Sequence, residues 1–412
     1  GQTQKALQIF NDALNAAGSI SSNSSKASAL NFIAKELAKA GQTQQALQIF
    51  DKALNVAEFI FFDSDKAKAL KDIASELAKA GQFDKAVTVA GSISDDSDKA
   101  KALKDIAKEL AKAGQTQQAL LIFDKALNAA GSIYDDSKKA SALSKIASEL
   151  AKAGQTQKAL QIFDKAIDVA GSISSDYYKA EALRDIASEL AKAGQTQKAL
   201  QIFDDALNVA GFIYDNDDKA RALKDIASEL AKAGQTQKAL QIFDDALNVA
   251  GFIYDNDDKA RALKDIAVEL AKAGQFDKAL TVAGFIYDND DKAWALSNIV
   301  VELAKAGQFD KAVTVARFIY DNDDKAWALS NIVVELAKAG QTQKALQIFD
   351  KAFDVAGSIS DDHYKASALR YIAVELAKAG QFDKAINLIN KKTGPYFTAY
   401  ILISIHQGYI ES

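Results

Sequence analysis

Residues 257–286, DDKARALKDIAVELAKAGQFDKALTVAGFI, contain one complete copy of a unit that recurs along the chain. Its phrase LAKAGQ returns with the glycine at positions 41, 81, 114, 154, 194, 234, 274, 307, 340 and 380. Successive glycines are either 40 or 33 residues apart. A period of this length is typical of one supersecondary unit stacked many times, and such an array offers an extended surface more than a single pocket.

The apolar residues of this stretch follow helical spacing, which places them on one stripe of a first helix. The stripe consists of Leu263, Ile266, Ala267 and Leu270. Asp257 and Asp258 precede it, and we expect their carboxylates to cap the helix by accepting its free backbone N–H groups. Gly274 is suited to the left-handed conformation that ends a helix, and a second helix is predicted from about Phe276. The unit is therefore predicted to be an antiparallel helical hairpin.

The 40-residue unit differs from the 33-residue unit by seven residues in its second helix, as in QTQKALQIFDDALNVAGFI at 235–253. Seven residues are close to two helical turns, so the phase slips by only about 20° and the same face stays buried. The two unit lengths are thus predicted to be two lengths of one helix. An insertion confined to a loop would not need this step.

The pattern resembles the tetratricopeptide repeat (TPR) family. The matching positions are Leu263, Ile266, Ala267, Leu270, Phe276 and Ala279, and in the longer unit Ala239, Phe243 and Ala246. The chain departs from the family by lacking the proline that usually closes a unit, since Pro395 is its only proline, and by having leucine for an aromatic in the first helix, as at Leu270. Other helical-hairpin arrays with repeats of about 40 residues remain an alternative.

The resemblance implies an all-α fold, a right-handed superhelical α-solenoid of antiparallel helix hairpins. Ten complete hairpins are expected, with an unpaired helix at each end. We predict one repeat array over residues 1–391 and a terminal helix, which is a cap or a docking element, over residues 392–412.

Composition argues against several classes of function. The net charge is −5, from 50 basic and 55 acidic residues, so neither nucleic acid nor an anionic membrane surface is favoured. No apolar run approaches the roughly 20 residues that span a bilayer. Cysteine is absent, and the two histidines, His363 and His406, lie in different elements. We therefore predict a soluble protein that is not an enzyme, with no cofactor, metal or small-molecule substrate, either cytoplasmic or exported after loss of an N-terminal signal.

Core positions barely change between the repeats, so the positions that vary are expected to lie on the surface. If the family's geometry holds, the first helices line a concave groove that is polar in its first half and apolar in its second. The second half is predicted to bind a partner through Trp294, Asn298, Val301, Trp327, Asn331, Val334, Tyr371 and Val374. The alternative is that Trp294 and Trp327 are core residues packed against adjacent helices.

A second variable stripe lies where the second helix enters the turn. Aromatic pairs flank a constant isoleucine there, and these edge aromatics are Phe212, Tyr214, Phe252, Tyr254, Phe285, Tyr287, Phe318 and Tyr320. Two interpretations are open, because the rings could cover the turn beneath them or make lateral contacts between chains. The neighbouring aspartates, such as Asp255, lack the glycine and distal glutamate of a calcium loop, so helix capping is favoured over metal binding.

The two ends of the chain are complementary in kind. The sequence opens with an unpaired second helix and closes with an apolar first helix. Their predicted contact residues are Leu7, Ile9, Phe10 and Leu14 at one end and Tyr396, Phe397, Tyr400, Ile401, Ile405 and Tyr409 at the other. Docking between molecules would be heterologous and need not close. We predict a protein–protein interaction and assembly scaffold whose partners are other protein chains, in the first place copies of itself joined head to tail in a filament. The alternative is a monomeric adaptor or sensor that binds a peptide or protein in the groove.

Overall fold

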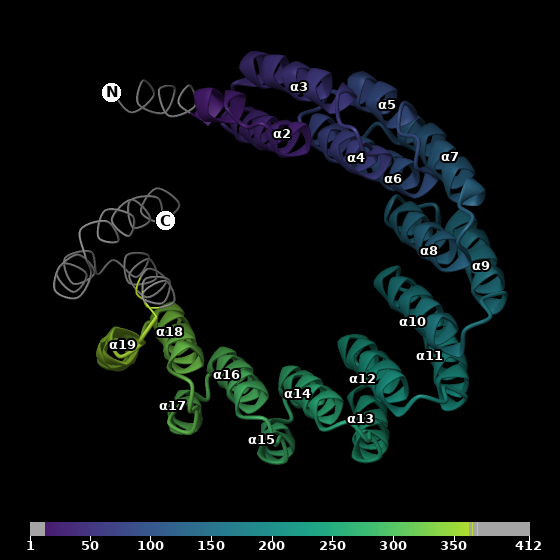
Figure 1. The fold of residues 1–412 in the computed structure, drawn as a ribbon. Coiled ribbons are helices and arrows are strands. Elements are labelled where there is room, and N and C mark those ends of the chain that lie inside the picture. The colour runs from purple at the N-terminus through teal and green to yellow at the C-terminus, as the bar shows by residue number, and fades with distance from the viewer. Residues whose placement is uncertain (1–12, 362–364, 366–368, 370–412) are drawn as a thin grey trace. The chain divides into compact units, whose positions relative to one another are not determined.

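The computed structural model describes residues 13–361, together with 365 and 369. Every regular element among these residues is an α-helix, and the helices follow one another in antiparallel pairs (Figure 1). The chain divides into two compact units, residues 1–209 and 210–412. The prediction of an all-α array of hairpins is confirmed for the described residues.

We call the first helix of each hairpin its A helix and the second its B helix. The A helices of the first unit are α2 (Asn23–Lys39), α4 (Asp63–Lys79), α6 (Asp96–Lys112), α8 (Asp136–Lys152) and α10 (Asp176–Lys192). Its B helices are α3 (Thr43–Glu58), α5 (Phe83–Gly91), α7 (Thr116–Ser132) and α9 (Thr156–Gly171). The next B helix, α11 (Thr196–Gly211), crosses the division between the units.

The second unit repeats the arrangement. Its A helices are α12 (Asn216–Lys232), α14 (Asn256–Lys272), α16 (Asn289–Lys305) and α18 (Asn322–Lys338). Its B helices are α13 (Thr236–Gly251), α15 (Phe276–Gly284), α17 (Phe309–Ala316) and α19 (Thr342–Gly357). None of the described helices has the length and apolar character needed to cross a membrane.

The start of α14 corrects the predicted cap. Asp255 is the N-cap, and its carboxylate accepts hydrogen bonds from the backbone N–H groups of Asp257 at 2.9 Å and Asp258 at 3.0 Å. Asp257 and Asp258 are therefore donors in the first turn, where their charges still face the positive end of the helix dipole. The prediction was wrong by about one turn because several carboxylates in a row satisfy the same sequence rule.

The end of α14 is as predicted. Gly274 has a φ of +78°, and the N–H of Gln275 bonds to the carbonyl of Leu270 at 2.8 Å, while the N–H of Gly274 bonds to Ala271 at 2.9 Å. These two bonds form a Schellman motif, which satisfies carbonyls that the helix leaves unpaired. The same left-handed glycine ends the other described A helices, so this residue sets the turn of each hairpin.

The two unit lengths are two lengths of the B helix, as predicted. α13 has 16 residues and α15 has 9. In α13 the fully buried side chains include Phe243, Ala246 and Ala250, whereas the short helix buries Ala279 and Ala283 on the corresponding face. A step of nearly two turns returns to the same face, so both lengths pack on the same A helices.

The hairpins form two layers, with A helices on one side and B helices on the other (Figure 1). Within a unit each A helix packs on the next A helix, and each B helix packs on its own A helix and on the following one. The core between the layers consists of alanines together with leucines and isoleucines, and the long B helices add a buried phenylalanine, such as Phe123 in α7 and Phe163 in α9. Small side chains allow the close approach of the layers.

Part of the sequence prediction lies outside the described residues. This holds for most of the tenth hairpin and the terminal helix, and for Leu7, Ile9, Phe10, Tyr371, Val374, Tyr396, Phe397, Tyr400, Ile401, Ile405 and Tyr409. At the other end, residues 13–18 are helical and Leu14 is half-buried.

Candidate functional site

The candidate site lies on the face formed by the A helices of the second unit, which we call the A-helix face. α14, α16 and α18 pack side by side there, and α16 and α18 have the same sequence, NDDKAWALSNIVVELAK. Trp294 is 43% exposed and Trp327 is 38% exposed, although the alanines on either side of each are buried. The alternative that these tryptophans are core residues is therefore wrong. Two large rings remain open to solvent in adjacent hairpins.

Trp294 contacts a cation from the preceding repeat. The Lys264 Nζ of α14 lies 5.2 Å from the centre of the Trp294 ring, and it also bonds to the Asp291 carboxylate at 2.6 Å. An ammonium over an indole face is attracted by the ring quadrupole, and the carboxylate adds an ion pair. The Trp294 ring and the Asp291 carboxylate thus form a binding site for a cation, and the Lys264 ammonium of the same chain occupies it.

The next hairpin repeats the ring and the carboxylate but not the cation. Ser297 of α16 occupies the position of Lys264, and its hydroxyl lies 3.4 Å from the Asp324 carboxylate. Burial and then the charge of Asp321 raise the pKa of Asp324 to about 6. The change from lysine to serine is visible in the sequence, but only the packing of α16 on α18 shows that it faces a carboxylate.

The other predicted groove residues divide by exposure. Asn298 and Asn331 are half-buried, and each side-chain amide donates to the carbonyl of the tryptophan one turn earlier, at 2.8 Å. Val334 is half-buried. Val301 is only 6% exposed, so it packs between helices and does not line the surface as predicted. The open apolar surface of this face is thus smaller than the sequence indicated and centres on the two tryptophans.

The A helices of the first unit form a polar counterpart. A hollow spans α4, α6, α8 and α10, and its charged lining residues are Lys71, Lys101, Lys104, Lys138, Lys145, Asp105, Glu181 and Asp185. Part of this charge is paired within the hollow, because Lys104 bonds to Asp105 at 2.6 Å and Lys71 reaches Asp98 at 3.1 Å. The polar character predicted for this half agrees with the lining.

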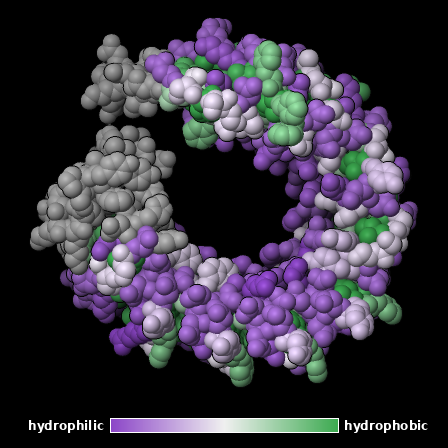
Figure 2. All heavy atoms as spheres, viewed as in Figure 1, coloured by the Kyte–Doolittle hydropathy of each residue, from purple (hydrophilic) through white to green (hydrophobic). Residues whose placement is uncertain are grey.

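The edge aromatics form a second candidate surface. Phe212, Phe252, Phe285 and Phe318 are 72–78% exposed, and Tyr214, Tyr254, Tyr287 and Tyr320 are 82–101% exposed. Figure 2 shows hydrophobic side chains projecting at intervals from a largely hydrophilic surface. The isoleucine between each pair is buried, as Ile286 is at 2%. The rings therefore do not cover the turn beneath them, and that interpretation is wrong.

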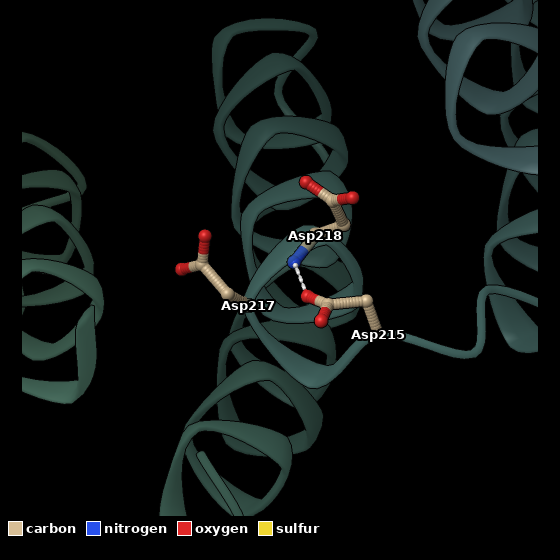
Figure 3. A group of neighbouring side chains, drawn as sticks. All are labelled: Asp215, Asp217 and Asp218. Carbon is tan, nitrogen blue, oxygen red and sulfur yellow. Dashed lines mark hydrogen bonds between the residues drawn. The ribbon is translucent and has the colours of Figure 1, made fainter. Parts of the chain in front are cut away.

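A cluster of carboxylates marks the start of α12. Single oxygens of Asp215, Asp217 and Asp218 lie within 4.8 Å of one another (Figure 3). Asp215 is the N-cap and accepts from the N–H of Asp218 at 3.0 Å, while Asp217 pairs with Arg221 at 2.6 Å. Burial raises the pKa of Asp217, against the opposing charge of Arg221. The cap at Asp215 is the role predicted for these aspartates, whereas the ion pair of Asp217 was not predicted.

These features define the class of protein as an α-solenoid whose surfaces, and not a pocket, carry the distinguishing residues. The family model described as tetratricopeptide repeat matches residues 138–211 and 178–251. The repeat phrase is the same before and after these residues, and residues 194–233 and 234–273 differ at one position, Ser228 against Val268. The tetratricopeptide repeat model thus describes residues 138–251, and the rest of the described chain repeats the same kind of helical hairpin.

Among curated proteins, none matches the chain. Several solved structures are similar to it. Ton1535 from Thermococcus onnurineus NA1 is 22% identical, with a TM-score of 0.40, over 81% of this chain and 97% of that chain. Aspartyl phosphate phosphatase F from Bacillus subtilis is 14% identical, with a TM-score of 0.33, over 82% and 95%. A STAND protein with a tetratricopeptide repeat sensor, PH0952 from Pyrococcus horikoshii, is 14% identical, with a TM-score of 0.30, over 95% and 53%.

Proposed function

We propose that the protein is a non-enzymatic interaction module that binds a peptide or protein segment on the A-helix face of its second unit. The exposure of Trp294 and Trp327 in adjacent hairpins carries this proposal. Exposed tryptophans dominate the binding energy of many interfaces, because a large ring loses water on contact and has few rotamers to immobilise. The two rings lie on rigid helices, so little of the binding energy is needed to order the site.

Selection of binding peptides from a random library against the full chain tests this function. Peptides that bind the wild type should lose at least about tenfold in affinity for the Trp294→Ala/Trp327→Ala double variant, since each ring is worth over 1 kcal/mol at an interface. Circular dichroism should show unchanged helix content, because both rings are open to solvent. Binding that is the same in the double variant would exclude this face.

The matched control removes an exposed ring from another surface. Phe252→Ser changes an edge aromatic that is 77% exposed, and serine stands at the equivalent position, Ser92, of another repeat. Peptides selected on the wild type should bind this variant with unchanged affinity. Loss of binding in both variants would indicate that the peptides recognise exposed aromatics in general.

We also propose self-association as a second function, favoured by the edge aromatics. Eight exposed rings in four consecutive repeats exceed the scattered apolar residues of an ordinary surface, and such patches mark contacts between proteins. The contact proposed here is lateral, between the edges of two chains. Head-to-tail joining through residues 2–17 and 396–410 stays a prediction, because its contact residues lie largely outside the described residues.

Sedimentation over a range of concentrations tests the lateral contact. The wild type should form larger species at high concentration, and Phe285→Ser, Tyr287→Ser, Phe318→Ser and Tyr320→Ser together should abolish the lateral dimers. Deletion of residues 395–412 separates the two modes, since it should abolish head-to-tail filaments in electron micrographs and leave lateral dimers. A wild type that stays monomeric throughout would refute self-association in both forms.

A further inference from the structure

The first turn of the A helices repeats a carboxylate whose partner can be compared between hairpins. At this position Asp98 pairs with Lys71 at 3.1 Å, Asp218 with Arg221 at 3.8 Å, Asp258 with Arg261 at 2.6 Å and Asp291 with Lys264 at 2.6 Å. Asp65, at the start of α4, is exposed to solvent and needs no partner. Asp324 is half-buried, and among the described residues it forms no ion pair.

The groups around Asp324 make an unpaired negative charge on its carboxyl unfavourable. The groups that act on its carboxyl are Asp321 and Asp323 on its own helix and Asp290 on α16, all of them acidic. The neutral Ser297 hydroxyl donates a hydrogen bond to this carboxyl at 3.4 Å, which favours its charged form. Burying a carboxylate among like charges is costly unless a positive group compensates it.

The preceding hairpin shows which group fits. There the Lys264 ammonium bonds to Asp291 and lies over Trp294, one turn along the same helix. α18 has the sequence of α16, so Trp327 and Asp324 present the same ring and carboxylate on the same scaffold. The difference is the side chain opposite them. Ser297 has three fewer carbon atoms than Lys264 and carries a hydroxyl in place of the ammonium.

From this comparison we infer that Trp327, Asp324 and Ser297 form a specificity site for a lysine side chain of a bound polypeptide. The partner's ammonium takes the place that Lys264 holds in the hairpin before, between the Trp327 ring and the Asp324 carboxylate. This inference rests on the proposed function of the A-helix face and names the residue type that the face selects. Charge complementarity supports lysine, because the local groups are acidic and a methylene stem covers the indole.

The two tryptophans of the chain allow a direct test. The full chain is labelled with nitrogen-15 tryptophan, which gives one indole N–H signal each for Trp294 and Trp327. The probe is the peptide acetyl-Gly-Gly-Lys-Gly-Gly-amide, and its neutral match has norleucine in place of lysine. The lysine peptide should shift the Trp327 signal in a saturable way, at least about fivefold more tightly than the norleucine peptide. Trp294 should not respond, because the Lys264 ammonium already occupies the place between that ring and the Asp291 carboxylate.

Two exchanges between the hairpins sharpen the test. Ser297→Lys supplies the chain's own ammonium to Asp324 and should abolish the Trp327 response. Lys264→Ser removes the ammonium from Asp291 and should make Trp294 respond as Trp327 does in the wild type. Each variant installs a residue that the neighbouring hairpin already carries, so both should keep the fold, as circular dichroism can verify. The wild-type titration is decisive even where one variant is unstable.

Several outcomes would overturn the site: no Trp327 response to the lysine peptide, an equal response to the norleucine peptide, or equal responses of the two tryptophans. These failures are distinct from failure of the proposed function. Library peptides that need Trp294 and Trp327 but contain no lysine would refute the lysine site and uphold the binding face. Lysine-rich library peptides that lose affinity in Asp324→Asn would uphold both.

Discussion

At the scale of single residues, Asp324 differs from the equivalent carboxylate of the preceding hairpin, Asp291, in having no lysine opposite it. Its pKa is raised to about 6 by burial, followed by Asp321. Asp291 has the same helix around it but faces Lys264. Equivalent carboxylates of two identical helices therefore have different partners, because the preceding hairpin offers a lysine to Asp291 and a serine to Asp324.

Replacing Asp324 by asparagine should stabilise the second unit at neutral pH. A carboxyl whose folded pKa lies above its ordinary value of 3.8 binds its proton more tightly in the folded state, so its contribution to stability falls as pH rises from about 4 through about 6. Because the group is partly exposed and screened, we expect a gain of ~1 kcal/mol at pH 7. Both tryptophans lie in the second unit, so thermal melting monitored by tryptophan fluorescence measures the stability of that unit. The gain in stability should vanish near pH 4.

Asp291→Asn is the matched control for that prediction. Here the substitution removes the ion pair with Lys264 and leaves the ammonium beside a neutral amide, so the melting temperature at pH 7 should fall. The expected cost is about 0.5–1 kcal/mol. Equal effects of the two substitutions would mean that the cation opposite the carboxylate is unimportant.

Gly307 shows how one residue sets a helix terminus. It has a φ of +74°, in the left-handed region, and ends α16. Gly307→Ala should destabilise the chain by about 1 kcal/mol because a side chain is strained in that conformation. Gly284→Ala should be neutral or stabilising, since Gly284 has an ordinary φ, ends the short helix α15 and has open space around its added Cβ. Differential scanning calorimetry compares the melting temperatures of the two variants and so separates backbone strain from a steric clash of the added methyl group.

At the scale of elements, long and short B helices differ by seven residues, and this difference keeps the same face of the helix buried. Deleting residues 236–242 from α13 leaves the phrase AGQFDDALNVAG, which resembles the natural short unit AGQFDKALTVAG at 273–284. We expect this variant to stay helical and to melt cooperatively. Deleting only residues 236–240 rotates the rest of the helix by about 140° and should expose Phe243, at a cost of about 3–5 kcal/mol. Circular dichroism and melting of the two deletions test this prediction, which is wrong if they behave alike.

At the scale of the whole molecule, contacts run between neighbouring hairpins, so a defect should remain local. Phe123→Ala removes a fully buried ring from α7 and should cost about 3–5 kcal/mol. Amide hydrogen exchange should speed up in α6 to α8 first and remain slow in α14 to α16. A uniform increase along the chain would show that the array unfolds as one cooperative unit.

Most of the fold could be predicted from the sequence, because its determinants are local and repeated. The glycine of LAKAGQ, the helical spacing of leucine and alanine, and the seven-residue step each act within one hairpin. The cap at Asp255 was misplaced since several aspartates compete for the same position. The candidate site was predicted less completely: its tryptophans were named, but Val301 was placed on the surface and the pairing of Lys264 with Asp291 was missed.

By itself, the sequence determined the hairpin, its two lengths and the buried stripe, because these follow from backbone conformation and from the period of apolar residues. The tertiary structure alone decided which positions beside that stripe remain open to solvent. Trp294 and Val301 lie on the same helix and were assigned to one surface, yet the first is exposed and the second is buried. The physical reason is that a helix has one periodicity but several neighbours, and the position of the adjacent A helix determines which of its flanks is covered.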